Sequence, residues 1–503
     1  MGKYKMKLAT IILVLALIIC GLESSVTFAD SKKFNGRYLA GDFHTHTYMT
    51  DGNKTLTEVV QNAFNSYGLD WMANSEHGGT SSRDPLGNSF TIPNNTTVTS
   101  LWRWITLKDY SFPIIEKLQK QYSDKVLIQG VEWNVPTHEH ASVAAILGNS
   151  VNPISDFEYM FDENDKDTSR SVENIKKVNK THADAVAGAK WLQTNYRNSS
   201  YFILNHPSRK LKYSIKDIRD FNDAAPDVFF GMEGFPGHQK EVERGGYTST
   251  DYKAETYGGA DYMTAQVGGV WDALLGEGRR FWIFVNSDFH DSSDTADFWP
   301  GEYAKSYTYV KENTAQGIVN GMRSGNSFAV QGDLINNLDF KISQNIKGNK
   351  TNVAEIGETL KIIKNNKDIT ITIKFKSPNK NNNNEAVKVN HIDLIAGDVI
   401  RKAVPETANY TKDTNETTKV IKRFNNSDWK VVDGWNVITY TVKNVNKDMY
   451  FRLIGTNLAV NTPNETDADG NPLADELVGD NNATKAYADL WFYSNPIFVR
   501  ANK

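Results

Sequence analysis

The chain has 503 residues and a formal net charge of −4, because its 56 Lys and Arg nearly balance its 60 Asp and Glu. This balance argues against nucleic acid or an anionic membrane as a partner, since both call for a basic surface. A single cysteine, Cys20, excludes a framework of internal disulfides, and the length calls for two or three domains.

Residues 1–29 have the pattern of a secretory signal peptide. Three lysines precede an apolar run over residues 8–20, and a polar stretch leads to a cleavage site that we expect after Ala29. The run is short for a membrane span, and we identify no later hydrophobic segment long enough for one. Ile19 stands before Cys20, where a lipoprotein site calls for a small residue. We therefore expect a secreted bacterial protein rather than a lipid-anchored one.

From residue 37 to about residue 330, apolar runs alternate with helical patterns, which is typical of a barrel of strands and helices. The expected strands are residues 37–44, 69–77, 125–133, 142–147, 201–207, 227–234 and 279–290. Helices are expected between them, for instance at 55–68, 111–122 and 183–196. Six of the seven strands carry a His, Asp or Glu at the C-terminal end, the rim at which such a barrel has its active site.

Beyond about residue 334, Lys and Asn become common and a low-complexity tract covers residues 379–384. Short alternating runs at 369–375, 391–397, 435–442, 449–455 and 495–501 predict a separate β-sandwich. We therefore expect a barrel domain over 30–335 and a β-sandwich domain over 336–503. In the sandwich, Trp429, Trp435 and Trp491 either form a carbohydrate platform, which would direct the domain to cell wall or glycan, or pack in its core.

The first expected strand leads into GDFHTHTYMTDG, where His44 and His46 share a face because alternate residues of a strand do. Both imidazoles can therefore bind one ion, although an isolated pair of this kind also occurs on surfaces by coincidence. Asp51 follows in a turn closed by Gly52, and its carboxylate either holds a neighbouring ion or caps the next helix. Thr55 is the better placed cap, which favours the metal role.

Later strand ends repeat this chemistry. His77 precedes two glycines that allow a tight turn, and Glu132 ends an apolar run, where an unpaired carboxylate is costly unless cations hold it. His140 follows Glu132 by eight residues, and His206 ends the fifth strand; each alone is more typical of a hydrogen-bonded core histidine. Asp288 and His290 repeat the alternate-residue geometry at the last strand.

The order of HxH with a following Asp-Gly, then EH, GxE, HP and SDFH resembles the PHP family, the polymerase and histidinol phosphatase metallohydrolases. The resemblance covers roughly residues 37–335 and implies a distorted (β/α)7 TIM-like barrel with two or three divalent ions, Zn, Mn or Fe. It implies one ion held by His44, His46, Glu132 and Asp288, a second by Glu132, His140 and His206, and a third by Asp51, His77 and His290. Some members have His where Asp51 stands, which implies either a weaker third site or a harder third ion.

Other residues near the expected rim have less specific roles. We expect Glu76 to orient His77 and Glu233 to support the ligands, whereas His238 is either a proton donor in the pocket or an ordinary loop histidine. Four cations, Arg83, Arg103, Lys108 and Arg209, either bind an anionic substrate or are solvated. Three further histidines, His138, His182 and His391, have no comparable context.

The leading hypothesis is a secreted metal-dependent phosphoesterase whose nucleophile is a hydroxide that bridges the ions. Glu132 and Asp288 would fix the ions, and His290 or His238 would protonate the leaving oxygen. A second hypothesis keeps this centre but takes a carboxylic or carbamic ester or amide, because the exported branch that the chain resembles, with its EGxPGHQ loop, is diverse in this way. A third is a non-enzymatic surface-binding protein, which the filled ligand positions disfavour.

Overall fold

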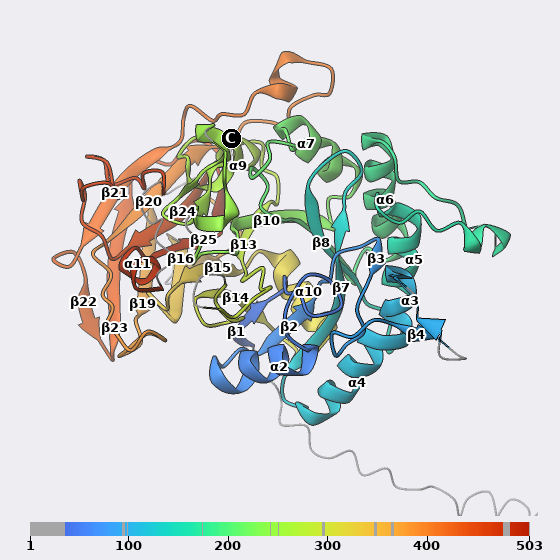
Figure 1. Ribbon diagram of the computed structural model, residues 1–503. Coiled ribbons are helices and arrows are strands. Elements are labelled where there is room, and N and C mark those ends of the chain that lie inside the picture. The colour runs from blue at the N-terminus through green and yellow to red at the C-terminus, as the bar shows by residue number, and fades with distance from the viewer. Residues whose placement is uncertain are drawn as a thin grey trace, which may run out of the picture. The chain divides into compact units, whose positions relative to one another are not determined.

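A large mixed β-sheet organises the computed structural model of the chain (Figure 1). The structure describes residues 36–501 except 93–95, 98, 174, 242, 250, 294–296, 347–349, 364–366 and 476–482. These residues belong to one unit, Gly36–Lys503, and the expected signal peptide lies outside them. In the part of the chain that the structure describes, every helix is too short or too polar to traverse a bilayer.

Each of the seven expected runs overlaps a strand of this sheet. In spatial order they are β13 (Trp282–Val285), β10 (Phe229–Phe235), β9 (Ser200–Leu204), β8 (His140–Ala145), β7 (Val126–Asn134), β2 (Trp71–Asn74) and β1 (Arg37–Asp42). Two strands that the sequence analysis did not identify, β14 (Ala304–Val310) and β15 (Ser327–Gln331), continue the sheet beyond β1. Short pairs join β3 (Thr80–Ser81) to β6 (Leu101–Trp102), β4 (Thr91–Ile92) to β5 (Thr96–Thr97), and β11 (Thr256–Tyr257) to β12 (Ala260–Asp261).

The direction of β8 departs from the expected TIM-like barrel. The pairs β1–β2, β2–β7, β9–β10 and β10–β13 are parallel, but β8 is antiparallel to both β7 and β9. Only residues 135–139 connect β7 to β8, which is too few for the crossover that a parallel strand requires. Asn134 pairs with His140 in this hairpin, so the first residue of β8 lies at the C-terminal end of β7.

The segments that follow the first and last of the seven strands lie side by side. Thr45, just after β1, forms a parallel bridge with Phe289, just after β13, and the N–H of His46 donates to the Phe289 carbonyl at 2.8 Å. The buried carboxylate of Asp42 accepts hydrogen bonds from the N–H groups of His44 and Ser287. The strand pairing does not show a closed TIM barrel, but it brings these two segments together.

Helices lie between the strands along the chain. They are α2 (Leu56–Gln61), α3 (Arg103–Thr106), α4 (Phe112–Gln121), α5 (Asn152–Phe161), α6 (His182–Asn195), α7 (Ile215–Ala224), α8 (Tyr262–Ala265), α9 (Val270–Gly276), α10 (Ala315–Ser324) and α11 (Ala483–Ala488). Thr55 caps α2 in a capping box with Glu58, so Asp51 is not the cap of this helix. The apolar face of α2, including Val59 and Val60, packs in a core shared with Met72 of β2.

The C-terminal part of the chain is built from strands in two sheets. A five-stranded sheet has the order β17 (Lys350–Glu355), β16 (Asn337–Ile346), β19 (Ile369–Lys376), β23 (Trp435–Val442) and β22 (Lys430–Val432). The other strands are β25 (Trp491–Ser494), β24 (Met449–Thr456), β20 (His391–Asp398), β21 (Lys419–Asn425), β26 (Ile497–Arg500) and β18 (Thr359–Lys361). Alternate apolar residues such as Ile371 of β19 and Leu394 of β20 share one buried core.

This second group of strands is not a separate sheet, as the predicted sandwich requires, because β25 pairs with β15 and continues the large sheet. The pairing covers a strand edge that would otherwise be open. The expected boundary between residues 335 and 336 therefore stays a prediction. Trp491 is fully buried and its indole N–H donates to Asp489, so it packs in the core, whereas Trp429 and Trp435 are half-buried.

Candidate metal centre

The nine predicted ligands lie in one cluster at the strand ends. The lining of a cavity of about 390 Å³ consists of Asp51, His77, Glu132, His140, His206, Arg209, His238, Glu241, Asp288, His290, Asp291 and Asp297. His44 and His46 are fully buried and lie against the lining residues Glu132 and Asp288. The antiparallel direction of β8 explains why His140 belongs to this cluster although it begins its strand.

Glu132 is the residue around which the imidazoles are arranged. Its Oε1 lies within 3.4 Å of ring nitrogens of three histidines, His44, His140 and His206. Its Oε2 lies within 3.4 Å of ring nitrogens of His46 and His77. A single buried carboxylate that faces five imidazoles has the geometry of a ligand shared between neighbouring ions.

Asp288 completes a second group of donors with the HxH pair. Its Oδ1 lies 3.0 Å from Nε2 of His44 and 3.2 Å from Nε2 of His46. The two Nε2 atoms are themselves 3.1 Å apart. Two imidazole nitrogens and a carboxylate oxygen therefore converge on one point, as the alternate-residue spacing of the HxH motif predicts.

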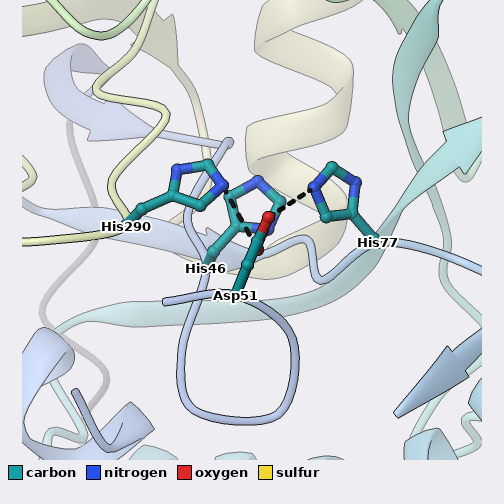
Figure 2. Close-up of side chains that lie close together, drawn as sticks. All are labelled: His46, Asp51, His77 and His290. Atoms are coloured by element: carbon teal, nitrogen blue, oxygen red, sulfur yellow. Dashed lines mark ion pairs between the residues drawn. The ribbon is translucent and has the colours of Figure 1, made fainter. Parts of the chain in front are cut away.

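Asp51 brings together the third group of donors (Figure 2). Its Oδ2 lies 3.3 Å from Nε2 of His77, and its Oδ1 lies 3.3 Å from Nε2 of His290. Nδ1 of His46 is 3.9 Å from the same Oδ1. The Asp51 side chain is 57% exposed, so this group lies on the solvent side of the cluster.

Several atoms of the cluster that could bind a metal ion are buried without a hydrogen-bond partner. They are Oε2 of Glu132, Oδ1 of Asp288, Nδ1 of His140 and Nδ1 of His206. Buried polar atoms are almost always satisfied, and a bound cation would satisfy these four. Imidazole nitrogens and carboxylate oxygens together suit borderline divalent ions such as Zn, Mn and Fe. The residues present therefore fit a centre of this kind.

The electrostatics differ from one candidate ligand to the next. Burial lowers the pKa of His44 and of His77, but nearby carboxylates outweigh it and raise the first well above its usual range and the second to about 10. Three other shifts favour the form that binds metal. Burial raises the pKa of Glu132, but the imidazoles of His140, His77 and His44 outweigh it and hold that pKa well below its usual range. Burial and the neighbouring imidazoles of His290 and His77 lower the pKa of His46 to about 3. Burial and the Arg209 guanidinium likewise lower the pKa of His206 to about 3. Glu132 is therefore ionised and these two histidines are neutral at pH 7.

The backbone at the centre is held in an unusual conformation. His206, His238 and Asp288 have φ values of 30°, 55° and 46°, in the left-handed region that non-glycine residues rarely adopt. A Cβ on Gly237 would lie 2.2 Å from the Cβ of Asp288, so only glycine permits this close approach. Such conformations cost free energy and gather at functional sites, where the surrounding structure maintains them.

Glu233 lies directly behind the HxH motif, as a supporting residue would. Its Oε1 is 2.7 Å from Nδ1 of His44, which leaves Nε2 of that ring free for a ligand role. The same carboxylate accepts hydrogen bonds from the side chain of Asn286 and from the backbone N–H of His206. Asn205, which the sequence analysis did not identify, donates to Oε1 of Glu132 at 2.8 Å.

Glu76 has a different role from the one expected. Its carboxylate accepts hydrogen bonds from the hydroxyls of Thr47 and Thr50, and the Thr50 hydroxyl lies 3.4 Å from Nδ1 of His46. Among the described residues, no hydrogen bond joins Glu76 to His77. Glu76 therefore fixes the turn after the HxH motif, because the threonines that face it belong to that turn.

His238 faces the pocket, as one of its two expected interpretations requires. Its Nε2 lies 3.1 Å from Oδ2 of Asp288, and its Nδ1 lies 2.7 Å from Oδ1 of Asp297. Oδ2 of Asp297 in turn accepts the backbone N–H groups of His290 and Asp291. Asp297 thus holds the His238 ring and the segment after β13 together. Burial lowers the pKa of His238, but Asp297 and Asp288 outweigh it and raise that pKa well above its usual range.

Only one of the four predicted substrate-binding cations lines the cavity. Arg209 lines the cavity, with Nη2 3.0 Å from Nε2 of His206 and 3.3 Å from Oε1 of Glu139. Arg103 is fully buried and donates to the carbonyls of His77 and Met49, so it supports the rim backbone instead. The two others also lie outside the cavity lining: Arg83 donates to the carbonyls of Thr50 and Gly52, and Lys108 lies over the Trp104 ring.

Comparisons with known proteins include a distant likeness to a solved structure. No family model matches the chain, and no curated protein matches it in sequence. Among solved structures, the chain resembles a two-domain protein from Bacteroides vulgatus ATCC 8482 that contains a predicted PHP-like metal-dependent phosphoesterase. The two share 12% sequence identity with a TM-score of 0.34, over 87% of this chain and 95% of that chain. At that TM-score the likeness assigns neither a fold nor a family.

Proposed function

We propose that the chain is a metal-dependent hydrolase, a phosphoesterase of the PHP type with a distorted (β/α)7 barrel and two or three divalent ions. The observation that carries the proposal is the Glu132 carboxylate, buried among five imidazoles with Oε2 unsatisfied. When bound, divalent ions supply Lewis acidity and a nucleophilic water at neutral pH. Turnover of a panel of phosphomonoesters, phosphodiesters and carboxylic esters by the purified, metal-loaded protein tests it.

The residues around the cavity divide the remaining work. Glu132 and Asp288 provide the negative charge that holds cations in place. Arg209 places a guanidinium at the cavity, where it binds and orients an oxygen of an anionic substrate. His238 donates a proton to the leaving oxygen from Nε2, while Asp297 orients the ring through Nδ1.

A carboxylic or carbamic ester or amide is the second candidate substrate. It is favoured by the scarcity of basic side chains, because Arg209 is the sole Arg or Lys among the described lining residues. A phosphodiester carries a single negative charge and needs no more than this one guanidinium. We therefore place phosphoesters first, and the same substrate panel separates the two classes.

We further propose that the protein is exported after cleavage behind Ala29. The support is the sequence pattern alone: a lysine-rich start, an apolar run and a polar cleavage region. Binding of cell wall or glycan by the C-terminal strands is proposed on the same footing, from the half-buried Trp429 and Trp435. N-terminal sequencing of protein from the culture medium, and sedimentation with purified cell wall, test the two statements.

Removal of metal is expected to destabilise the protein. Without a cation, the clustered carboxylates and imidazoles lose their shared partner. At a free metal concentration of about 100 times Kd, each filled site adds about 2.7 kcal/mol to the free energy of unfolding. The melting temperature should therefore fall on treatment with a chelator and recover when Zn²⁺ or Mn²⁺ is returned. A chelator saturated with metal beforehand is the control, and identical melting temperatures in all samples would contradict the metal centre.

Replacing His238 by Gln is expected to lower kcat about 100-fold while metal content stays at the wild-type level. The loss should be larger for an alkyl phosphate than for a nitrophenyl phosphate, because a nitrophenolate departs without a proton. A His238 that served only to support the fold would slow both substrates equally. Asp297→Asn, which weakens the orientation of the same ring, should show the same dependence on leaving group with a smaller loss.

A further inference from the structure

Two histidines without a role in the centre lie together at a second place. His138 belongs to the connection between β7 and β8, and His182 is the first residue of α6. Nε2 of His138 lies 2.8 Å from Nδ1 of His182, and Oδ1 of Asp217 in α7 lies 3.7 Å from that Nδ1. Donor atoms of the three side chains all lie within 4.8 Å of one another.

The outer nitrogens of both rings already have acceptors. Nδ1 of His138 lies 2.8 Å from the carbonyl oxygen of Lys212, and Nε2 of His182 lies 3.1 Å from Oδ2 of Asp220. A carbonyl and a carboxylate only accept hydrogen bonds, so each outer nitrogen carries the ring proton. If both rings are neutral, Nε2 of His138 and Nδ1 of His182 then each carry a lone pair and no proton. Lone pairs 2.8 Å apart repel one another unless a cation lies between them.

The surroundings hold the donors in this arrangement. The Tyr213 ring stacks on His138 with centroids 5.1 Å apart and an interplanar angle of 8°, and the Phe221 ring contacts both imidazoles. In the capping box of α7, the backbone N–H and the hydroxyl of Ser214 both donate to Oδ2 of Asp217, so Oδ1 is left to face His182. Hydrogen-bonded outer nitrogens and fixed rings are the features that orient histidine ligands of transition metals.

We propose that His138, His182 and Asp217 form a second site for a divalent transition metal of the Zn²⁺ class, separate from the main centre. Two imidazole nitrogens and one carboxylate oxygen are the three protein ligands of an open zinc site, with a water as the fourth. The His182 side chain is 30% exposed, so the ion has a path from solvent. Because the three ligands come from a loop and two helices, the ion fastens the loop that leads into His140 onto α6 and α7.

Zinc stoichiometry of the full-length protein tests this site. The protein is stripped with a chelator, dialysed against Zn²⁺ and analysed for zinc per chain. His182→Gln and His138→Gln should each bind one equivalent less than the wild type. Asp220→Asn, which weakens the outer hydrogen bond of His182, should retain the site with about 10-fold lower affinity in a competition titration.

Lys216→Gln is the matched control, because Lys216 pairs with Asp220 at 2.6 Å but offers no ligand, and its zinc stoichiometry should equal that of the wild type. Circular dichroism confirms that each variant is folded, and the two histidine variants serve as substitutes for each other if one is not. Wild-type stoichiometry in the folded histidine variants overturns the proposal, since the cation between the rings is then a proton. The result is independent of the main centre, whose ligands are unchanged.

Discussion

Glu132→Gln is expected to remove hydrolysis and to lower the metal content of the protein. Glutamine offers one oxygen where glutamate offers two, and its amide group turns a donor toward imidazoles that need an acceptor. Oε1 and Oε2 of Glu132 each lie within 3.4 Å of imidazole nitrogens, so either orientation of the amide loses one side of the cluster. We expect kcat/KM for an aryl phosphate to fall about 1000-fold. Steady-state kinetics and elemental analysis of the same preparation measure both effects.

Glu416→Gln is the matched control for this substitution. Its side chain is 78% exposed and pairs with Lys412 on the surface, so kinetics and metal content should equal those of the wild type. Wild-type turnover in a folded Glu132→Gln variant would exclude the proposed mechanism. Normal metal content with lost turnover would instead show that Glu132 acts on substrate and that the remaining ligands suffice for the ions.

The strands of the large sheet up to β13 were predictable because short, strongly apolar sequences favour buried strands. The runs YFIL and FWIFV are apolar throughout, and their strands β9 and β13 are buried on both faces. The direction of each strand in the sheet was not predictable, because an apolar run has the same sequence pattern in a parallel and in an antiparallel strand. For β8 the deciding fact is the length of its connection to β7, which is too short for a crossover.

The C-terminal strands show the limit of reading domains from composition. The alternation of ITITIKF correctly predicted β19, with burial on every second residue. The partner of a strand, however, is set by which edges meet in space. Phe328 of β15 pairs with Ser494 of β25 across more than 160 residues, and no local pattern in either segment specifies that contact.

The candidate ligands were predictable because they follow one rule, that chemistry stands at strand ends. His44, His77 and Asp288 obey it directly. Asp297 does not, since it lies in an irregular segment after β13, and its contact with His238 appears only in three dimensions. Arg103 shows the opposite case. Its position near the rim suggested a substrate-binding role, but its guanidinium donates hydrogen bonds to backbone carbonyls.

The continuity of the large sheet places a buried ion pair between its C-terminal strands and the helices. Arg452 of β24 binds Asp272 of α9 through two hydrogen bonds of 2.7 and 2.9 Å, and both side chains are fully buried. Tyr450 and the N–H of Gly268 also donate to this carboxylate. Arg452→Met keeps the volume but leaves the Asp272 charge buried without its cation. We expect the free energy of unfolding in urea to fall by about 3–5 kcal/mol.

The pair can be separated from simple loss of packing with two further variants. Arg423 of β21 binds Asp393 in a similar pair but is 26% exposed, so Arg423→Met should cost only about 1 kcal/mol. The double variant Asp272→Asn, Arg452→Met removes both charges and should be more stable than Arg452→Met alone, because no uncompensated carboxylate remains. If the double variant is instead less stable by the sum of the single losses, the side chains act through packing. In that case α9 and β24 are joined by shape rather than by charge.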